Sequence, residues 1–273
     1  MQAAAHTELP VIDHCEDTAL AEEIILTGSL SCERNRLAGL HYKPPSSEEV
    51  MVARDVLFAH ETGCRLHVQH ISSAGSVALL RFAAHRGIPA SGEVTPHHIA
   101  LTCEAVSQHG TNAKMNPPLR EESDRTAILE GLKDGTIAVI ATDHAPHTAE
   151  DKKLPLAEAP YGVVGLETAV PVCMDELVHT GVLTLPELIA KFTRGPRELL
   201  GLEAGTLSPG APADITVLDP QADVVVDKNT FVSKARNTPF HGRRCKGRVL
   251  ATIVSGHWTY DDTTVRDHRN NRP

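Results

Sequence analysis

Aromatic residues are scarce, at 3% of the 273 residues, although hydrophobic residues of all kinds make up 41%. A core built from this chain must therefore consist mainly of Ala, Val, Ile and Leu side chains. A chain of this length and apolar content is long enough to bury a sizeable core. We expect one large domain with a small appended one.

The sequence has no excess of positive charge. It contains 26 Lys and Arg against 35 Asp and Glu, for a net charge of −9. No run of Lys and Arg interleaved with aromatics supplies a local basic field. This balance argues against a polyanion as partner, so nucleic acid is not expected to bind.

Long apolar runs and paired cysteines are also missing. The first ten residues lack the cationic start and apolar stretch of a signal peptide, and no later stretch approaches a membrane span. We expect a cytoplasmic protein with no membrane partner. The cysteines form no Cys-x-x-Cys pair, which predicts reduced thiols: Cys15, Cys32, Cys64, Cys103, Cys173 and Cys245.

What the chain does have is a repeating alternation of short apolar runs with helical patterns. Such alternation is typical of parallel strands covered by helices. The strands are expected at residues 10–13, 65–69, 88–94 and 137–142, and the helices between them at 47–62, 74–86 and 122–133.

The pattern changes in the last third. Helices are expected at 165–179, 185–192 and 196–200, and strands joined by Gly and Pro turns at 207–209, 214–218, 223–226 and 250–254. The predicted domains are a metal-dependent hydrolase portion at 1–204, a small β domain at 205–260 packed around Trp258, and a flexible tail at 261–273.

The strand count sets a limit on the fold. A closed (β/α)8 barrel needs eight strands, and the first domain offers four. We therefore predict an α/β fold containing a partial (β/α)8 TIM-like barrel with a small flanking β domain. Its exposed sheet edges would have to be covered by further sequence or by a partner.

Polar residues gather where the predicted strands end, and these ends share one edge of a parallel sheet. His14, His70 and Asp143 each follow such a strand. Imidazole nitrogens and a carboxylate are ligands that zinc prefers. We predict that these three residues bind metal and that Asp143 is also catalytic, carrying a proton to the leaving nitrogen.

Structural alternatives remain open for each residue. A single strand-end His is more often a hydrogen-bonded structural residue, and one of His97 and His98 can simply cap the next helix. Asn116 precedes two prolines and is held at a fixed angle, either to bind a cyclic imide or to satisfy a turn. Arg120 is more typical of a salt bridge or the surface. Residues 159–162 are expected to form either a turn whose backbone approaches a small ligand closely, because Gly162 has no side chain, or simply a loop.

Five motifs carry a family resemblance. They are Asp-His-Cys-Glu-Asp at 13–17, Val-Gln-His-Ile-Ser at 68–72, Glu-Val-Thr-Pro-His-His at 93–98, Lys-Met-Asn-Pro-Pro-Leu-Arg at 114–120 and Ala-Thr-Asp-His-Ala-Pro-His at 141–147. Together with residues 161–168 and 237–240, they resemble the long-chain bacterial dihydroorotases, members of the amidohydrolase superfamily. The likeness extends over nearly the whole chain.

The resemblance implies the reversible conversion of N-carbamoyl-L-aspartate to dihydroorotate in pyrimidine synthesis, with two zinc ions in a complete site. It implies that His14 and His70 bind the second metal, and that Asp143 binds the first and acts as acid and base. By the same likeness, Asn116 and His147 contact substrate through side chains, and Tyr161 and Gly162 through backbone.

Several family features have no counterpart in the sequence: the His-x-His pair of the first strand, the Arg and Asn that hold substrate, and the residue bridging the metals. We expect them upstream of Met1, so that activity of this chain alone is impaired. Two alternatives stay open. One is a noncatalytic subunit supporting aspartate carbamoyltransferase, and the other is a hydantoinase-like cyclic amidohydrolase. As partners we expect the small-molecule substrate and either a second copy of the chain, in a homo-oligomer, or aspartate carbamoyltransferase.

Overall fold

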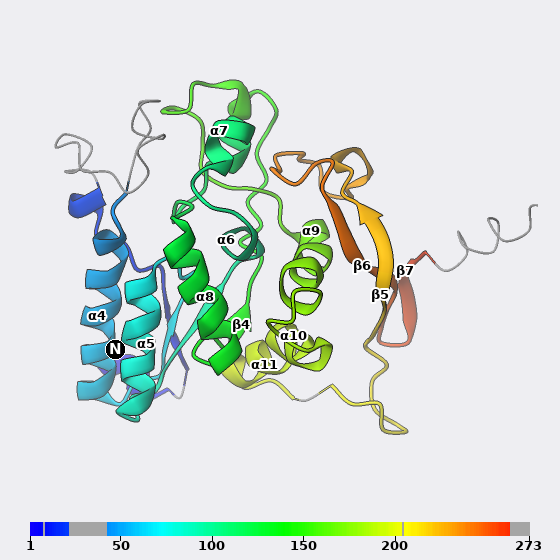
Figure 1. Ribbon diagram of the computed structural model, residues 1–273. Helices are drawn as coiled ribbons and strands as arrows, with labels where there is room; N and C mark the ends of the chain where they lie inside the picture. The colour runs from blue at the N-terminus through cyan, green and yellow to red at the C-terminus, as the bar shows by residue number, and fades with distance from the viewer. Residues whose placement is uncertain (8, 22–42, 204, 263–273) are drawn as a thin grey trace, which may run out of the picture.

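The protein contains two β-sheets, one parallel and one antiparallel, with helices packed on the parallel one (Figure 1). The structure is a computed structural model that describes residues 1–7, 9–21, 43–203 and 205–262. Its parallel sheet has four strands in the order β1-β2-β3-β4, and its antiparallel sheet has three in the order β5-β6-β7. The predicted α/β class is confirmed.

The parallel strands lie where the apolar runs predicted them, but each is shorter. They are β1 Val11–Asp13, β2 Leu66–Val68, β3 Ala90–Val94 and β4 Val139–Ile140. Asp13 is opposite Val68, and Val68 is opposite Gly92, so the first strands end at one level. Residues just beyond them therefore share one edge of the sheet.

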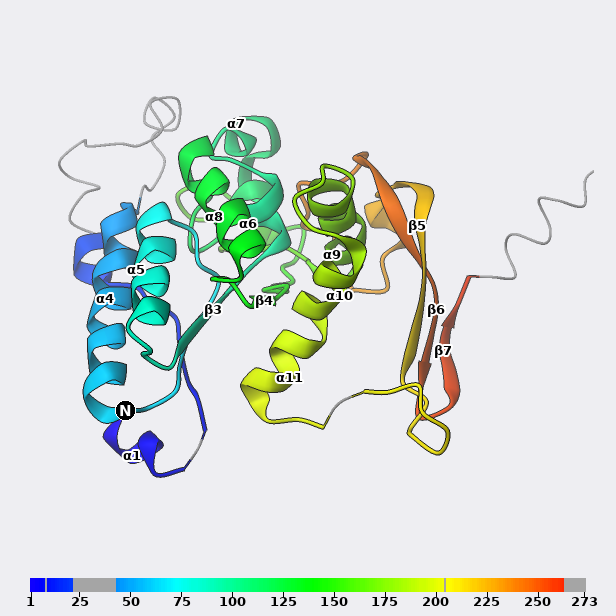
Figure 2. The same ribbon diagram turned by 60° about the horizontal axis from the view of Figure 1, so that its bottom comes forward.

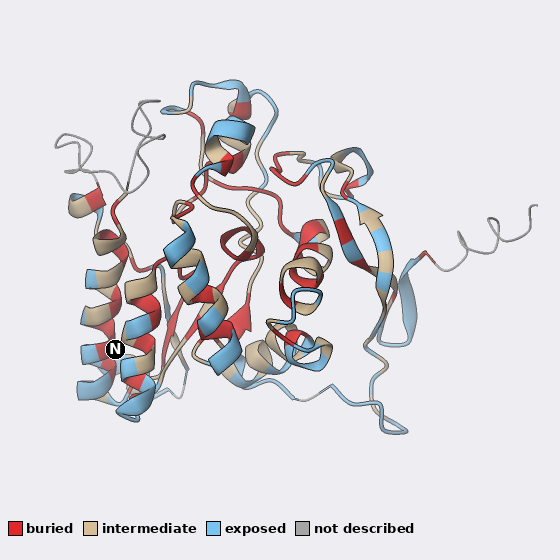
Figure 3. Ribbon diagram, in the orientation of Figure 1, coloured by how far each residue is buried: buried red, intermediate tan, exposed pale blue. Residues whose placement is uncertain are grey.

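Three helices cover one face of this sheet: α4 Pro45–Thr62, α5 Ala74–His85 and α8 Glu122–Asp134. Their ends follow local chemistry. The Ser73 side chain accepts from the backbone N–H of Ser76 at the start of α5, and Gly63 and Gly135 end α4 and α8 with φ values of 69° and 87°. Figure 3 shows the buried side of these helices facing the strands, of which β2 and β4 are buried throughout.

Several short elements surround the sheet ends and were not predicted. Residues before β1 form α1 Gln2–Ala5, and β3 is followed by α6 Pro96–Ala100, α7 Ala105–His109 and the 3-10 turn η1 Gly110–Ala113. A second 3-10 turn, η2 Asp151–Lys153, lies in the loop after β4. The elements that follow β3 and β4 lie beyond the carboxyl ends of the strands, where α7 is at the top of Figure 1.

The predicted helix at 165–179 is present as α9 Leu166–Cys173, which continues into a π-helical turn, η3 Met174–Val178. Then come α10 Leu185–Phe192 and α11 Arg194–Leu200. A capping box between Thr184 and Glu187 starts α10. Figure 2 places α9 and α10 between the parallel sheet and the antiparallel one.

The antiparallel sheet differs from its prediction in three ways. It comprises β5 Ile215–Val225, β6 Arg244–Val254 and β7 His257–Asp261, with the 3-10 turn η4 Lys228–Thr230 after β5. Residues 207–209 form no strand, and 214–218 and 223–226 belong to one continuous segment, because β6 supplies a single long partner for both. β7 was missed.

Trp258 does not pack the small β domain as predicted. It lies on β7, an edge strand whose residues are all exposed, and 60% of Trp258 is accessible. The apolar contact between this sheet and α9 is made instead by a separate cluster: Val164, Val172, Val226, Phe231, Phe240 and Cys245. β7 is paired only with β6, and none of its side chains is buried by the helices.

Other predictions on the scaffold have mixed outcomes. The cysteines described, which exclude Cys32, are all free and buried. Within the described ranges, no helix is long and apolar enough to cross a membrane. Most of the predicted tail, residues 263–273, lies outside the described residues, and the boundary at residue 204 stays a prediction.

Candidate active site at the carboxyl ends of the parallel strands

His14 and His70 face each other at the ends of β1 and β2. His14 Nδ1 lies 2.9 Å from His70 Nε2, and the rings meet edge to face. His70 adopts a φ of 31° and Asp143, beyond β4, a φ of 45°. Positive φ is costly for residues other than glycine and is frequent at functional sites. Two of the predicted metal ligands, His14 and His70, thus lie together, and the third, Asp143, shares the positive φ of His70.

The second nitrogen of His14 is held by a carboxylate. His14 Nε2 lies 3.0 Å from Glu16 Oε2, which also accepts from Asn116 Nδ2 at 2.6 Å, and Lys43 donates to the other oxygen. Burial alone would raise the pKa of Glu16, but these hydrogen bonds from Lys43, Asn116 and His14 lower it to about 2. The ionised carboxylate keeps a proton on His14 Nε2 and leaves Nδ1 free as an acceptor towards His70.

The histidine pair fits a divalent cation. Burial, and then the charge of His14, lower the pKa of His70, so its ring is held in the neutral form that binds metal. Two imidazole nitrogens on one tetrahedral zinc lie about 3.3 Å apart, close to the 2.9 Å found here. His70 Nδ1 is buried without a hydrogen-bond partner among the described residues.

Asp143 is not joined to that pair in a compact ligand set. Within the described part of the chain, the three potential ligands whose atoms all lie within 4.8 Å of one another are Asp13, Cys15 and Asp55. Asp143 is close enough for its charge to act on His70. Its assignment as a ligand stays a prediction.

Asp13, Cys15 and Asp55 form a hydrogen-bonded cluster that joins β1 to α4. The Cys15 thiol lies 3.6 Å from a carboxylate oxygen of each aspartate, and Arg54 ion-pairs with Asp55 at 2.7 Å and Asp13 at 3.6 Å. Burial, with the charges of Asp55 and Asp13, raises the pKa of Cys15, and burial and a bond to Asp13 raise that of Asp55 to about 6. The thiol is therefore held in its protonated form, which donates to the two carboxylates.

Asn116 is oriented by a side chain and not by turn backbone. Its Nδ2 donates to Glu16 and lies 3.3 Å from His14 Nε2. Its Oδ1 is buried and has no partner among the described residues. An unsatisfied buried acceptor suits a ligand N–H, which is the contact predicted for this amide.

The turn at Tyr161 and Gly162 lies against His147, so three of the residues predicted to contact substrate are brought together. His147 Nε2 donates to the Tyr161 carbonyl at 2.7 Å. Gly162 has a φ of 126°, and a Cβ there would stand 2.4 Å from the Cβ of Ala145. Only glycine fits this close approach.

Asn237 is a clamp that the sequence did not reveal. Its Nδ2 donates to the carbonyls of Ala145 and Gly162, both at 3.0 Å, and its Oδ1 accepts from the backbone of His147 at 3.1 Å. It comes from the segment between β5 and β6, more than seventy residues away in sequence. The only sequence signal was its place in the motif at 237–240.

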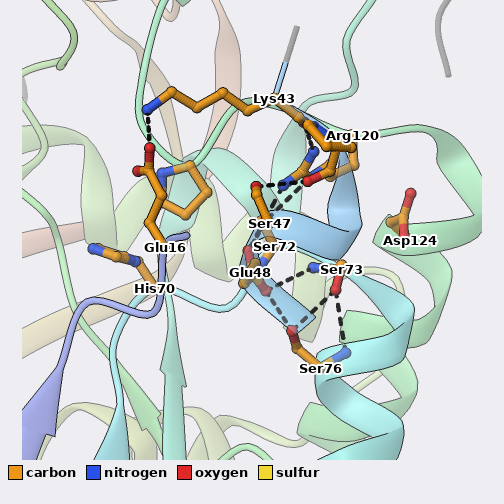
Figure 4. Close-up of polar contacts among 12 residues, drawn as sticks. Glu16, Lys43, Ser47, Glu48, His70, Ser72, Ser73, Ser76, Arg120 and Asp124 are labelled. Carbon is orange, nitrogen blue, oxygen red and sulfur yellow. Dashed lines mark hydrogen bonds and ion pairs between the residues drawn. The ribbon is translucent and has the colours of Figure 1, made fainter. Parts of the chain in front are cut away.

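A buried polar network holds the loop after β2 (Figure 4). Glu48 of α4 accepts from the backbone of Ser72 at 3.1 Å and of Ser73 at 3.3 Å, and from Ser76 Oγ at 2.6 Å. Arg120 donates to Ser72 Oγ at 3.0 Å and lies 3.8 Å from Glu48. The salt-bridge prediction for Arg120 is confirmed, but the surface alternative is wrong because its neighbours bury it. The network ties the His70 loop to the Asn116 loop.

His98 has the structural role that the sequence left open. Its Nε2 donates to the Pro117 carbonyl at 3.1 Å, and its Nδ1 is 2.8 Å from Thr95 Oγ1, whose residue caps α6. His97 is buried and its Nε2 has no partner within the described ranges. Burial, then the charges of His98 and His70, keep the pKa of His97 well below its usual value.

Comparison with known proteins agrees with this geometry. Residues 46–259 match the model of the amidohydrolase family, and residues 1–76 match that of dihydro-orotase-like proteins. The chain belongs to the amidohydrolase family. The first match alone covers well over half of it, including every parallel strand except β1.

Among relatives of this amidohydrolase, a dihydroorotase of Pelotomaculum thermopropionicum is 51% identical over 267 residues, which are 97% of this chain and 62% of the relative. A dihydroorotase of Thermoanaerobacter is 48% identical, over 93% of the chain and 58% of that protein. The chain therefore spans about three-fifths of the length of these relatives. The L-hydantoinase (dihydropyrimidinase) of Arthrobacter aurescens has a similar structure, with a TM-score of 0.86 and 28% identity over 96% of the chain and 59% of that structure.

Proposed function

We propose that this amidohydrolase supplies the carboxyl-side part of a dihydroorotase active site, for the reversible cyclisation of N-carbamoyl-L-aspartate to dihydroorotate. The observation that carries the proposal is the convergence of His14 Nδ1 and His70 Nε2, 2.9 Å apart, beside the Asn116 amide fixed on Glu16. A metal-ligand pair and an imide-binding amide then share one strand edge. The substrate assignment rests on the dihydroorotase relatives.

His14 and His70 would hold a zinc ion, and Asp143 is proposed as a further ligand. When bound, the ion lowers the pKa of water and polarises a carbonyl. Glu16 contributes by fixing the His14 ring, because the hydrogen bond to Nε2 directs Nδ1 into the site. A complete site of two ions needs ligands that the described residues do not supply.

Hydrolysis of dihydroorotate breaks its ring amide bond: a hydroxide adds to the carbonyl carbon and the leaving nitrogen gains a proton. Asp143 is proposed to take the proton from water and deliver it to that nitrogen. Asn116 Oδ1, buried without a partner among described residues, would accept from a ring N–H. The backbone of Tyr161 and Gly162, held by His147 and Asn237, would complete the pocket wall.

The parallel sheet is proposed to be half of a (β/α)8 barrel. Four strands in sequential order, all parallel, leave β1 and β4 each paired with one described strand. The remaining strands would come from further sequence or a partner. A noncatalytic role in support of aspartate carbamoyltransferase is the second candidate, favoured by the absence of a compact three-ligand site from His14, His70 and Asp143.

Turnover of dihydroorotate by the purified chain with added zinc, together with bound-metal analysis, tests these proposals. Asp143→Ala should abolish turnover, whereas the matched control Asp223→Ala, on an exposed position of β5, should not. Zinc retention without turnover would favour the noncatalytic role. Hydrolysis of hydantoin but not dihydroorotate would overturn the substrate assignment in favour of a hydantoinase-like enzyme. If the chain showed no turnover and bound no zinc, that result would contradict a functional site in this chain.

A further inference from the structure

A small cavity beside His147 is lined by cations and by no carboxylate. Its volume is about 250 Å³, and it is formed by three segments: η1, the loop after β4, and the segment between β5 and β6. The lining residues are Asn112, His147, Thr148, Ala149, Lys152, Lys153, Lys228, Lys234, Ala235, Arg236 and Asn237. Four lysines and an arginine meet here in a chain whose net charge is −9.

One of the four lysines of the cavity, Lys152, is buried. Lys152 is 8% exposed, and its ammonium donates to the carbonyls of Thr111 at 3.0 Å and Pro160 at 2.8 Å. It has no ion pair with any described carboxylate, although a buried charge usually has a counterion. An ammonium has three donors, and two are used. The third donor has no hydrogen-bond partner among the described residues.

The acidic residue nearest in sequence is already engaged. Asp151 accepts from the hydroxyl of Thr148 at 2.7 Å and from its backbone at 3.3 Å, and it does not line the cavity. Lys153, Lys228 and Lys234 form no ion pair within the described ranges. The positive charge of the cavity is therefore not balanced by the surrounding described residues.

We propose that this cavity is a binding site for a small phosphate-bearing anion. Lysines act as point charges that suit the several oxygens of a phosphate, whereas carboxylates are more often held by the two-pronged arginine contact. Arg236 Nη1 is already engaged with the carbonyls of Ser233 and Ala235, whereas four lysines line the cavity. Phosphate binding would neutralise the buried Lys152.

The site adjoins the proposed substrate pocket but is separate from its proposed chemistry. His147 lines the cavity with its loop and donates from Nε2 to Tyr161 on the other side, and Asn237 contacts both regions. An anion here would be positioned to stabilise the loop at 147–153. The proposal does not depend on dihydroorotase activity, because binding can be measured without turnover.

The test is titration of the purified chain with inorganic phosphate by calorimetry, in zinc-free buffer with chloride at matched ionic strength. Saturable binding should weaken about tenfold or more in Lys228→Gln/Lys234→Gln, because charge-assisted hydrogen bonds are lost. The matched control is Lys133→Gln/Lys246→Gln, which removes two exposed lysines outside the cavity. A phosphate monoester should bind if the cavity is open to larger ligands of this class.

Folding of each variant is checked by circular dichroism without phosphate, and Lys153→Gln serves as a second, milder cavity variant. Equal affinity in the cavity variants and the unsubstituted chain would overturn the proposal. Equal weakening by the control pair would also overturn it, because that result would indicate a general charge effect. Absence of saturable binding beyond chloride would do the same.

Discussion

At the scale of single residues, Lys152 shows how burial sets protonation in this fold. Burial, and then the charge of Lys114, lower the pKa of Lys152 to about 8 from an ordinary value of 10.5. The folded state therefore binds fewer protons than the unfolded state between these values, so its stability rises with pH across that window. We expect the stability difference between the unsubstituted chain and Lys152→Met to be flat below pH 8.

Above pH 8 the difference should grow in favour of the unsubstituted chain, by up to about 3 kcal/mol at pH 10.5. Urea unfolding in phosphate-free buffer at several pH values measures it. Lys133→Met, at an exposed position in the last turn of α8, corrects for the general effect of removing a lysine. A difference that stays constant with pH would contradict the role given to burial.

Glu16 provides a second test at this scale, since it orients the His14 ring through Nε2. Glu16→Gln removes the carboxylate and should weaken zinc binding by about tenfold or more, as for other hydrogen-bond partners of metal-binding histidines. Competition with a chromogenic chelator measures the affinity. Glu158→Gln, at an exposed position in the loop after β4, is the control and should leave affinity unchanged. Unchanged zinc affinity in Glu16→Gln would contradict the role of Glu16 in orienting His14 for zinc binding.

At the scale of elements, the Glu48 and Arg120 network determines how α4, α5 and the two site loops fit together. Arg120→Met would leave Glu48 buried with one partner fewer, and removing one member of a buried pair typically costs about 3 kcal/mol or more. We expect that loss in urea unfolding, together with faster hydrogen exchange at the Ser72 and Ser73 amides, which Glu48 accepts from.

Arg81→Met is the matched control, because Arg81 and Asp134 form a largely exposed pair between α5 and α8. Its cost should stay below about 1 kcal/mol. The double variant Glu48→Gln/Arg120→Met should cost less than the sum of its two single substitutions, since the buried charge is removed with its partner. Additive costs would show that the two side chains act independently.

The same network marks the limit of prediction from sequence. Repeating apolar runs were enough to place all four parallel strands and α4, α5 and α8, because periodicity and end residues such as Ser73 and Gly135 act locally. The strand ends also predicted that His14 and His70 lie at one edge of the sheet, and the two rings are in contact there. The clamp by Asn237 depends on contacts across more than seventy residues, and no local pattern encodes them.

At the scale of the whole molecule, the antiparallel sheet is fastened to the rest through β6 and the π-helical turn η3. Gly247 of β6 has a φ of 105°, and a Cβ there would stand 2.7 Å from the Cβ and Cγ of Met174. Gly247→Ala should therefore combine backbone strain with overpacking, at a cost of about 2 kcal/mol or more. Gly256→Ala is the control, since it has a φ of 81° with nothing within 4 Å.

The two substitutions also test whether the sheets unfold together. The single Trp258 lies on β7 and reports on the antiparallel sheet by fluorescence, whereas far-ultraviolet circular dichroism follows mainly the helices around the parallel sheet. In the unsubstituted chain the two urea transitions should coincide, as in a cooperative unit. Gly247→Ala should move the fluorescence transition to lower urea than the dichroism transition, because the added Cβ clashes with Met174 and forces β6 and η3 apart, while Gly256→Ala should leave them together. Equal costs and coincident transitions in both variants would mean that the sheets are coupled through the cluster around Phe240 and Cys245 and not through this glycine.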